Sequence, residues 1–214
     1  VILVDAVGGV EVGTELAWRT AADFGLPRLF VINRMDRENA SFSRTYQAIE
    51  EYMHAAGGRV VKVQLPIGEK HEFKGVIDLI SMKAYMADGK AVTDIPADMK
   101  AAAEEAHFAL VEAAAEGEDT LLEKYLENGS LSDEELIRGL KDVVHSGAFV
   151  PVFVAAGGHE IGIGPLLNAM VDLMPSPAQR PSKVVLGKDG NEEKLTCSDT
   201  GPLAAYIWKT SADP

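Results

Sequence analysis

Cysteine is almost absent from this sequence of 214 residues, in which Cys197 is the only one. A single cysteine excludes a disulfide within the chain and a metal cage built from several thiolates. Long apolar runs are also lacking, because no stretch approaches the roughly 20 apolar residues that a membrane-spanning helix needs. We therefore expect a cytoplasmic protein in reducing surroundings, with no membrane partner.

Basic residues are few, since 20 Lys and Arg face 33 Asp and Glu and give a net charge of −13. Such an acidic surface repels nucleic acid backbones, so we expect any ribonucleoprotein partner to be met through its protein components. The five histidines are scattered, and no two have the spacing of metal ligands on one element. We expect no metal site, and we expect His159 and Glu160 to be solvated loop residues.

The composition that remains is that of an ordinary globular protein, with 47% hydrophobic and 25% charged residues. At its start, residues 1–4 predict a buried strand followed by Asp5, and residues 29–32 predict a second strand. Between them Thr14 is the expected cap of a helix that Gly25 ends. This strand, helix, strand order predicts two parallel strands of a doubly wound sheet.

In the rest of the chain, segments with the apolar spacing of helices alternate with segments that have the apolar spacing of strands. We expect a helix over 42–53, strands over 60–68 and 75–80, and a hairpin over 84–92 with Asp88 and Gly89 at its turn. Further on we expect helices from 96 to 147, a buried strand over 150–154, a helix over 163–174, a proline-rich linker over 175–181, and a strand over 202–210. Ser132 and Glu135 predict a capping box at the start of the last helix before 147.

A polar cluster directly follows the second predicted strand: Asn33, Arg34 and Asp36. In parallel doubly wound sheets, ligands bind beyond the carboxyl ends of the strands. A carboxylate there can accept from both N1–H and the 2-amino group of guanine, and the stem of a long cation can cover the ring. The alternative is a plain strand-to-helix turn in which Asp36 or Asn39 caps the next helix.

The segment INRMDRE resembles the N-K-x-D guanine-specificity motif of translational GTPases. The order of the surrounding segments resembles elongation factor G along nearly the whole chain. The matching segments are DAVGGVEVGTELAWR, GLPRLFVINRMDRENASF, FKGVIDLISMKAYM, LLEKYL, VPVFVAAG and GPLLNAMVDLMPSP.

The resemblance implies an α/β fold: a partial doubly wound P-loop-GTPase-type sheet with an inserted α+β subdomain, ending in the first strand of a β-barrel domain. Residues 1–64 would be the second half of the GTP-binding domain, 65–147 the inserted subdomain, 148–175 the last strand and helix of the GTP-binding domain, and 176–214 a linker and the start of the barrel.

The same resemblance implies a binding site for GTP and GDP. It assigns base recognition to Asn33, Arg34 and Asp36, and it assigns contacts with guanine O6 to the backbone N–H groups of Ala156 and Gly157. Two features depart from the family. Arg34 replaces its lysine, and Ala155 to Gly157 replaces its G-S-A loop and so lacks the serine hydroxyl.

The sequence contains no G-x-x-x-x-G-K-[ST] phosphate loop, no switch threonine and no D-x-P-G-H segment, and GTP hydrolysis in such proteins requires all three. We therefore expect a fragment that holds base recognition, from a parent GTPase that uses magnesium, acts on the ribosome in protein synthesis and is monomeric. The acidic run from Asp98 to Asp119 is either a solvated helix face or a docking face for the basic ribosomal stalk protein. The alternative function is a non-catalytic interaction module that uses this acidic helical surface.

Overall fold

The computed structural model describes residues 1–87, 92–179, 182–201 and 203–211. The chain forms two compact units, Val1–Met174 and Pro175–Pro214.

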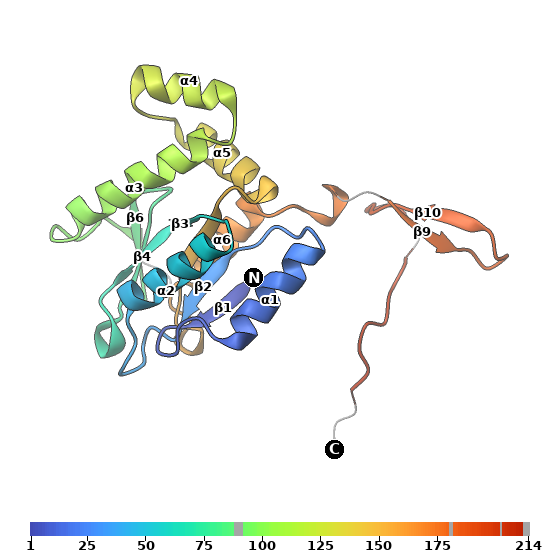
Figure 1. Cartoon of the computed structure of the whole chain (residues 1–214), viewed down its shortest axis with the longest axis horizontal. Helices are drawn as coiled ribbons and strands as arrows, with labels where there is room; N and C mark the ends of the chain where they lie inside the picture. Colours follow the sequence, from blue (N-terminus) through green and yellow to red (C-terminus); the bar gives the residue numbers. More distant parts are fainter. Residues whose placement is uncertain (88–91, 180–181, 202, 212–214) are drawn as a thin grey trace. The chain divides into compact units, whose positions relative to one another are not determined.

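A four-stranded parallel sheet forms the centre of the first unit, with the strand order β1-β2-β8-β3 (Figure 1). Its strands are β1 (Ile2–Asp5), β2 (Phe30–Asn33), β3 (Val60–Lys62) and β8 (Val150–Val154). All five residues of β8 are buried. This run of apolar residues is typical of a parallel strand covered on both faces, and it places β8 in the core.

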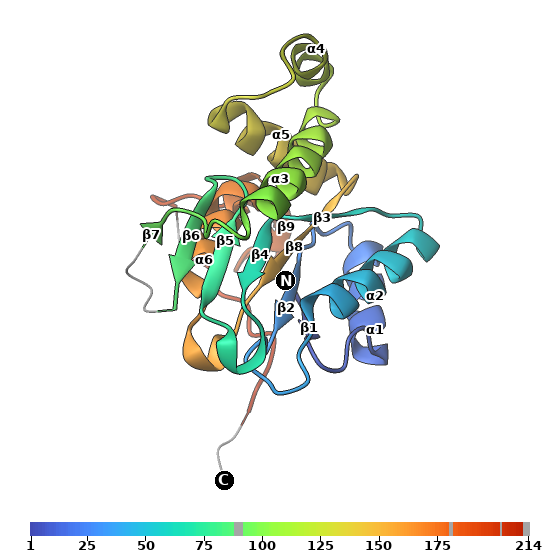
Figure 2. The same ribbon diagram turned by 90° about the vertical axis from the view of Figure 1, so that its left-hand side faces the viewer.

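Helices cover this sheet: α1 (Val12–Asp23), α2 (Phe42–Ala55) and α6 (Ile163–Leu173). Figure 2 shows α1 and α2 on one face and α6 on the other. Helices α1 and α2 share a face because their right-handed crossovers, from β1 to β2 and from β2 to β3, run in the same direction along the strand order. On the first face, the ring of Trp18 from α1 stacks on the ring of Phe30 from β2 with centroids 5.5 Å apart. That contact fixes the first crossover helix against the sheet.

The start of α1 differs from the prediction. The cap is Glu11 rather than Thr14, and the hydroxyl of Thr14 accepts a hydrogen bond from the backbone N–H of Glu11 at 3.3 Å. Thr14 is buried and lies one turn inside the helix. The sequence prediction was wrong here because a threonine can serve either side of a capping box.

Between β3 and β8 the chain builds an antiparallel sheet and three helices (Figure 2). These elements are β4 (Gln64–Ile67), the 3₁₀ turn η1 (Lys70–Glu72), β5 (Gly75–Asp78), β6 (Lys83–Met86), β7 (Val92–Thr93), α3 (Lys100–Ala115), α4 (Asp119–Asn128) and α5 (Asp133–Ser146). The predicted capping box is confirmed: the hydroxyl of Ser132 accepts from the N–H of Glu135, and the carboxylate of Glu135 accepts from the N–H of Ser132. The predicted turn at Asp88 and Gly89 lies outside the described residues.

The second unit contains an antiparallel hairpin of β9 (Lys183–Leu186) and β10 (Glu192–Leu195), which the sequence analysis did not predict. It also contains the 3₁₀ turn η3 (Pro177–Gln179). The strand predicted over 202–210 is not formed in the described residues 203–211. An alternating pattern alone does not make a strand, because its backbone groups need a paired neighbour. Among the described residues, no helix is long and apolar enough to cross a membrane.

Candidate functional site

The carboxyl ends of β1, β2 and β8 meet at one edge of the parallel sheet. Asp5 at the end of β1 lies in register with Asn33 at the end of β2, and Ile32 lies in register with Val154 at the end of β8. The loops that follow these strands therefore share one mouth, where ligands bind in folds of this type.

A buried methionine anchors the polar segment after β2. Met35 is fully buried, its N–H donates to the carbonyl of Ala155 at 3.3 Å, and its carbonyl accepts from the N–H of Lys70 at 2.8 Å. Arg34 and Asp36 flank this anchor, and Arg34 has a φ of 65°, an uncommon backbone conformation for a residue with a side chain.

Asn33 joins the two segments that were predicted to contact guanine. Its side-chain Oδ1 accepts from the N–H of Gly157 at 3.0 Å, across a sequence separation of 124 residues. Together with the bond from Met35 to Ala155, this contact holds the segment after β2 against the loop after β8. The structure thus brings Asn33, Arg34 and Asp36 to the same place as Ala156 and Gly157.

The loop after β8 uses both N–H groups that were predicted to contact guanine O6. The N–H of Ala156 donates to the carbonyl of Ile161 at 3.0 Å, and the carbonyl of Ala156 accepts the N–H of Ile161 in return at 3.3 Å. This exchange closes the 3₁₀ turn η2 (Gly157–His159). The N–H of Ala156 is therefore tied to backbone, whereas that of Gly157 is bonded to a side chain that can turn.

Arg34 forms an ion pair with Asp5, with 2.8 Å between Nη1 and Oδ2. The other oxygen of Asp5 accepts from the N–H of Val7 at 2.8 Å. Partial burial favours the neutral acid, but the hydrogen bonds from backbone and from Arg34 outweigh it, so the pKa of Asp5 lies below its ordinary value. The carboxylate of Asp5 thus fixes both the loop after β1 and the cation of the base motif.

Asp36 does not cap the following helix. The cap of α2 is Ser41, whose hydroxyl accepts from the N–H of Arg44, and the N–H of Phe42 donates to Glu69 at 2.7 Å. The side chain of Asp36 is 24% exposed, and its Oδ2 lies 3.4 Å from Nε2 of His159. The alternative in which Asp36 or Asn39 caps α2 is therefore wrong.

Sequence reasoning assigned no role at the site to two of its neighbours, Asp5 and His159. The position of Asp5 at the end of the first predicted strand was a usable signal, since the carboxyl ends of parallel strands converge. His159 is exposed, as expected of a loop residue, but its contact with Asp36 depends on how two distant loops meet. No pattern along the chain predicts that contact.

The described residues contain no group of three or more His, Cys, Asp or Glu side chains arranged to hold a metal ion.

Residues 1–176 match the family described as Elongation factor Tu GTP binding domain. The structure is also similar to the crystal structure of a protein from Thermus thermophilus, with a TM-score of 0.72 and 31% sequence identity. The match covers 86% of this chain and 29% of that chain, so this chain spans less than a third of the protein that it resembles.

Proposed function

The chain belongs to the family of elongation factor GTP-binding domains, as an elongation factor G-like translational GTPase, and we propose that it is the part of such a protein that recognises guanine. The observation that carries this proposal is the pair of hydrogen bonds that joins the segment from Asn33 to Asp36 with the loop after β8. A base entering this mouth would meet Asp36 on one side and the N–H of Gly157 on the other.

Each residue of the proposed site has a distinct task. The carboxylate of Asp36 accepts from N1–H and the 2-amino group of guanine, which adenine does not offer in that arrangement. The stem of Arg34 covers the ring, while its guanidinium is held by Asp5. The N–H of Gly157 donates to Asn33 in this structure and serves O6 when the side chain of Asn33 turns away, and Ala156 shapes the turn that presents this N–H.

From the family we also propose the domain boundaries, the reaction and the partners of the intact protein. Residues 1–64 are the second half of the GTP-binding domain, residues 65–147 its inserted α+β subdomain, and residues 148–175 its last strand and helix. Residues 176–214 are a linker and the start of a β-barrel domain. The protein that carries this chain hydrolyses GTP and acts on the ribosome, with the acidic helix α3 and its flanks as the contact for the basic stalk protein.

Replacing Asp36→Asn in the intact protein that contains this chain tests the site. The amide of Asn offers one acceptor and one donor, so guanine loses one hydrogen bond, whereas xanthine has a carbonyl at that carbon and restores the match. Sites that read hydrogen bonds reject mismatched bases by as much as roughly 10⁴ to 10⁵. Competition between GDP and XDP should therefore reverse in the mutant.

The matched control is Asp23→Asn, the same chemical change at an exposed position at the end of α1. It should leave the preference for GDP unchanged. An unaltered preference for GDP in the Asp36→Asn protein would mean that Asp36 does not read the base, and the proposal would fail.

A further inference from the structure

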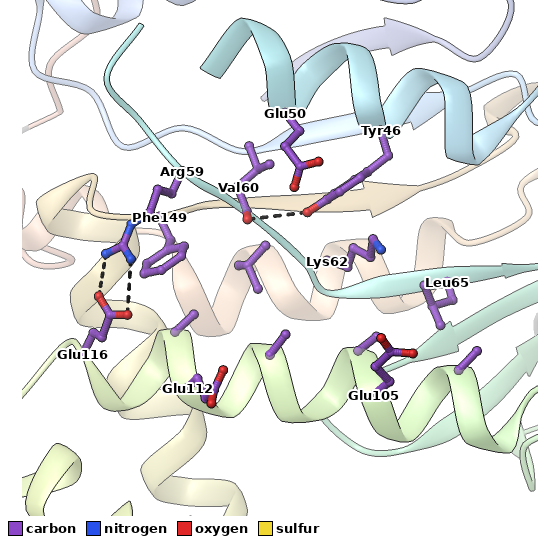
Figure 3. Close-up of a pocket in the computed structure, with 15 residues that line it drawn as sticks. Tyr46, Glu50, Arg59, Val60, Lys62, Leu65, Glu105, Glu112, Glu116 and Phe149 are labelled. Atoms are coloured by element: carbon purple, nitrogen blue, oxygen red, sulfur yellow. Dashed lines mark hydrogen bonds and ion pairs between the residues drawn. The ribbon is translucent and has the colours of Figure 1, made fainter. Parts of the chain in front are cut away.

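A groove of about 600 Å³ runs between β3 and helix α3, away from the candidate guanine site (Figure 3). Its size lies within the range of about 300 to 1,000 Å³ that is typical of ligand pockets. Buried apolar side chains line its base, among them Val61, Leu65 and Phe149. The groove thus combines an apolar base with walls of two different kinds, a strand edge and a helix face.

The strand wall presents backbone groups. Within the described residues β3 pairs only with β8, and the bonds to β8 use the carbonyl of Arg59 and the N–H of Val63. Because successive residues of a strand point their N–H and C=O groups to opposite sides, the groups of Val60 and Lys62 face the groove. The only partner that the structure gives them among described residues is the Tyr46 hydroxyl, 3.5 Å from the carbonyl of Val60, a long and weak hydrogen bond.

The helix wall carries small side chains beside its glutamates. Ala102, Ala106, Ala109 and Ala113 recur at helical spacing along the side of α3 that lines the groove. Methyl groups leave the space along the free edge of β3 open, so a polypeptide in extended conformation has room beside this edge. Addition of a strand to a free sheet edge is a recurrent mode of peptide recognition.

The charges of the groove favour a basic occupant. Glu50 on α2 and Glu105 on α3 are exposed on opposite walls (Figure 3), and the structure records no ion pair for either among the described residues. The two cations of the groove are already engaged. Arg59 pairs with Glu116 and lies 3.9 Å above the ring of Phe149, and Lys62 lies 4.6 Å above the ring of Tyr46.

We propose that this groove binds an extended basic segment of another protein, which adds as a strand to the edge of β3 and places its cations against Glu50 and Glu105. The proposal does not depend on guanine recognition, and it differs from the stalk-protein contact proposed for α3 because it requires the backbone edge of β3. Lysine on an edge strand can instead serve to prevent edge-to-edge pairing, and in that case Lys62 would keep β3 without any partner.

The test uses the 214-residue chain and a defined probe, the fluorescent peptide acetyl-Lys-Val-Lys-Val-Lys-amide, in a low-salt buffer where charge steering is strongest. We expect measurable binding by fluorescence anisotropy, and slower hydrogen exchange at the amides of Val60 and Lys62. A peptide with Glu in place of Lys should not bind. A peptide with the same charges but with alternate backbone nitrogens methylated should bind at least about tenfold more weakly, because it cannot pair with the edge.

Matched variants on α3 locate the binding. Ala109→Phe fills the groove, whereas Ala101→Phe makes the same change at an exposed position that does not line it. Glu105→Lys reverses a groove charge, whereas Glu104→Lys makes the same change at an exposed neighbour outside the groove. We expect Ala109→Phe and Glu105→Lys to weaken binding by about tenfold or more, roughly 1.4 kcal/mol, and the two controls to change it by less than about twofold.

Equal effects of each variant and its control would overturn the proposal, since binding would then follow the overall charge of the helix. Equal affinity for the methylated peptide would overturn strand addition, and so would an absence of binding at peptide concentrations of about 1 mM.

Discussion

Arg34 of the base motif and Asp5 at the end of β1 form an ion pair with Nη1 and Oδ2 2.8 Å apart, across 29 residues of sequence. Arginine stands where the family has lysine, and its fork of donors needs a partner in a fixed position. Asp5 supplies that partner, and two backbone N–H groups hold its carboxylate in place. The substitution in the motif and the carboxylate of the neighbouring strand therefore act together.

A double-mutant cycle measures this pair. We expect Asp5→Asn and Arg34→Met, which keeps the apolar stem, to show a coupling of about 0.2 to 1 kcal/mol in urea unfolding of this chain, because the side chain of Arg34 is 60% exposed and water screens the charges. In the intact protein, Asp5→Asn should weaken GDP binding only when Arg34 is present. A coupling near zero would show that Asp5 does not position Arg34.

The isolated chain should bind GTP weakly, with a Kd above about 1 μM. Its sequence contains no phosphate loop, and such loops bind the triphosphate through backbone N–H groups and a lysine, which supply much of the affinity for the nucleotide. Isothermal titration calorimetry with GTP and magnesium measures this. Sub-micromolar binding would contradict the expectation.

Acid should weaken the start of α5 through Glu135. Its hydrogen bonds to Lys124 and to Ser132 lower its pKa from 4.5 to about 2. A carboxyl group with a lowered pKa in the folded state stabilises the fold fully above its unfolded pKa, and this contribution is lost as the pH falls toward the folded value. The loss should therefore fall between about pH 4.5 and pH 2.

Unfolding free energies measured between about pH 6 and pH 2 on the native chain and on Glu135→Gln test this directly. The mutant should be less stable at about pH 6, and the difference should shrink toward about pH 2. Glu134→Gln, an exposed neighbour in the same helical turn, is the control and should follow the native profile. Parallel profiles for native protein and Glu135→Gln would rule the contribution out.

Two glycines in helices should respond in opposite directions to alanine. A Cβ at Gly139 of α5 would lie 2.3 Å from the carbonyl oxygen of Ala114 in α3, so Gly139→Ala forces the helices apart. We expect a loss of about 1 to 3 kcal/mol, typical of overpacking. At Gly13 of α1 nothing lies within 4 Å of the added atom, so Gly13→Ala should stabilise by about 0.4 to 1 kcal/mol. Urea unfolding of both variants compares them, and equal shifts would contradict the close approach of α3 and α5.

Local chemistry made much of the fold predictable. The runs of β-branched residues in β2 and β8, the helical spacing in α2 and the capping box at Ser132 each depend on neighbours a few residues away. The wrong predictions arose where a local pattern fits more than one structure. Thr14 fits two positions of a capping box, and the alternation over 202–210 carries no information on whether a partner strand exists.

The sequence by itself determined that Asn33, Arg34 and Asp36 follow a buried strand, because apolar periodicity and the polar cluster after it are properties of consecutive residues. Only the tertiary structure decided which residues meet them: Gly157 bonds to Asn33, Asp5 pairs with Arg34, and His159 contacts Asp36. These contacts join segments up to 124 residues apart. They depend on strand order and on the packing of loops at one edge of the sheet, which arise only when the whole core is assembled.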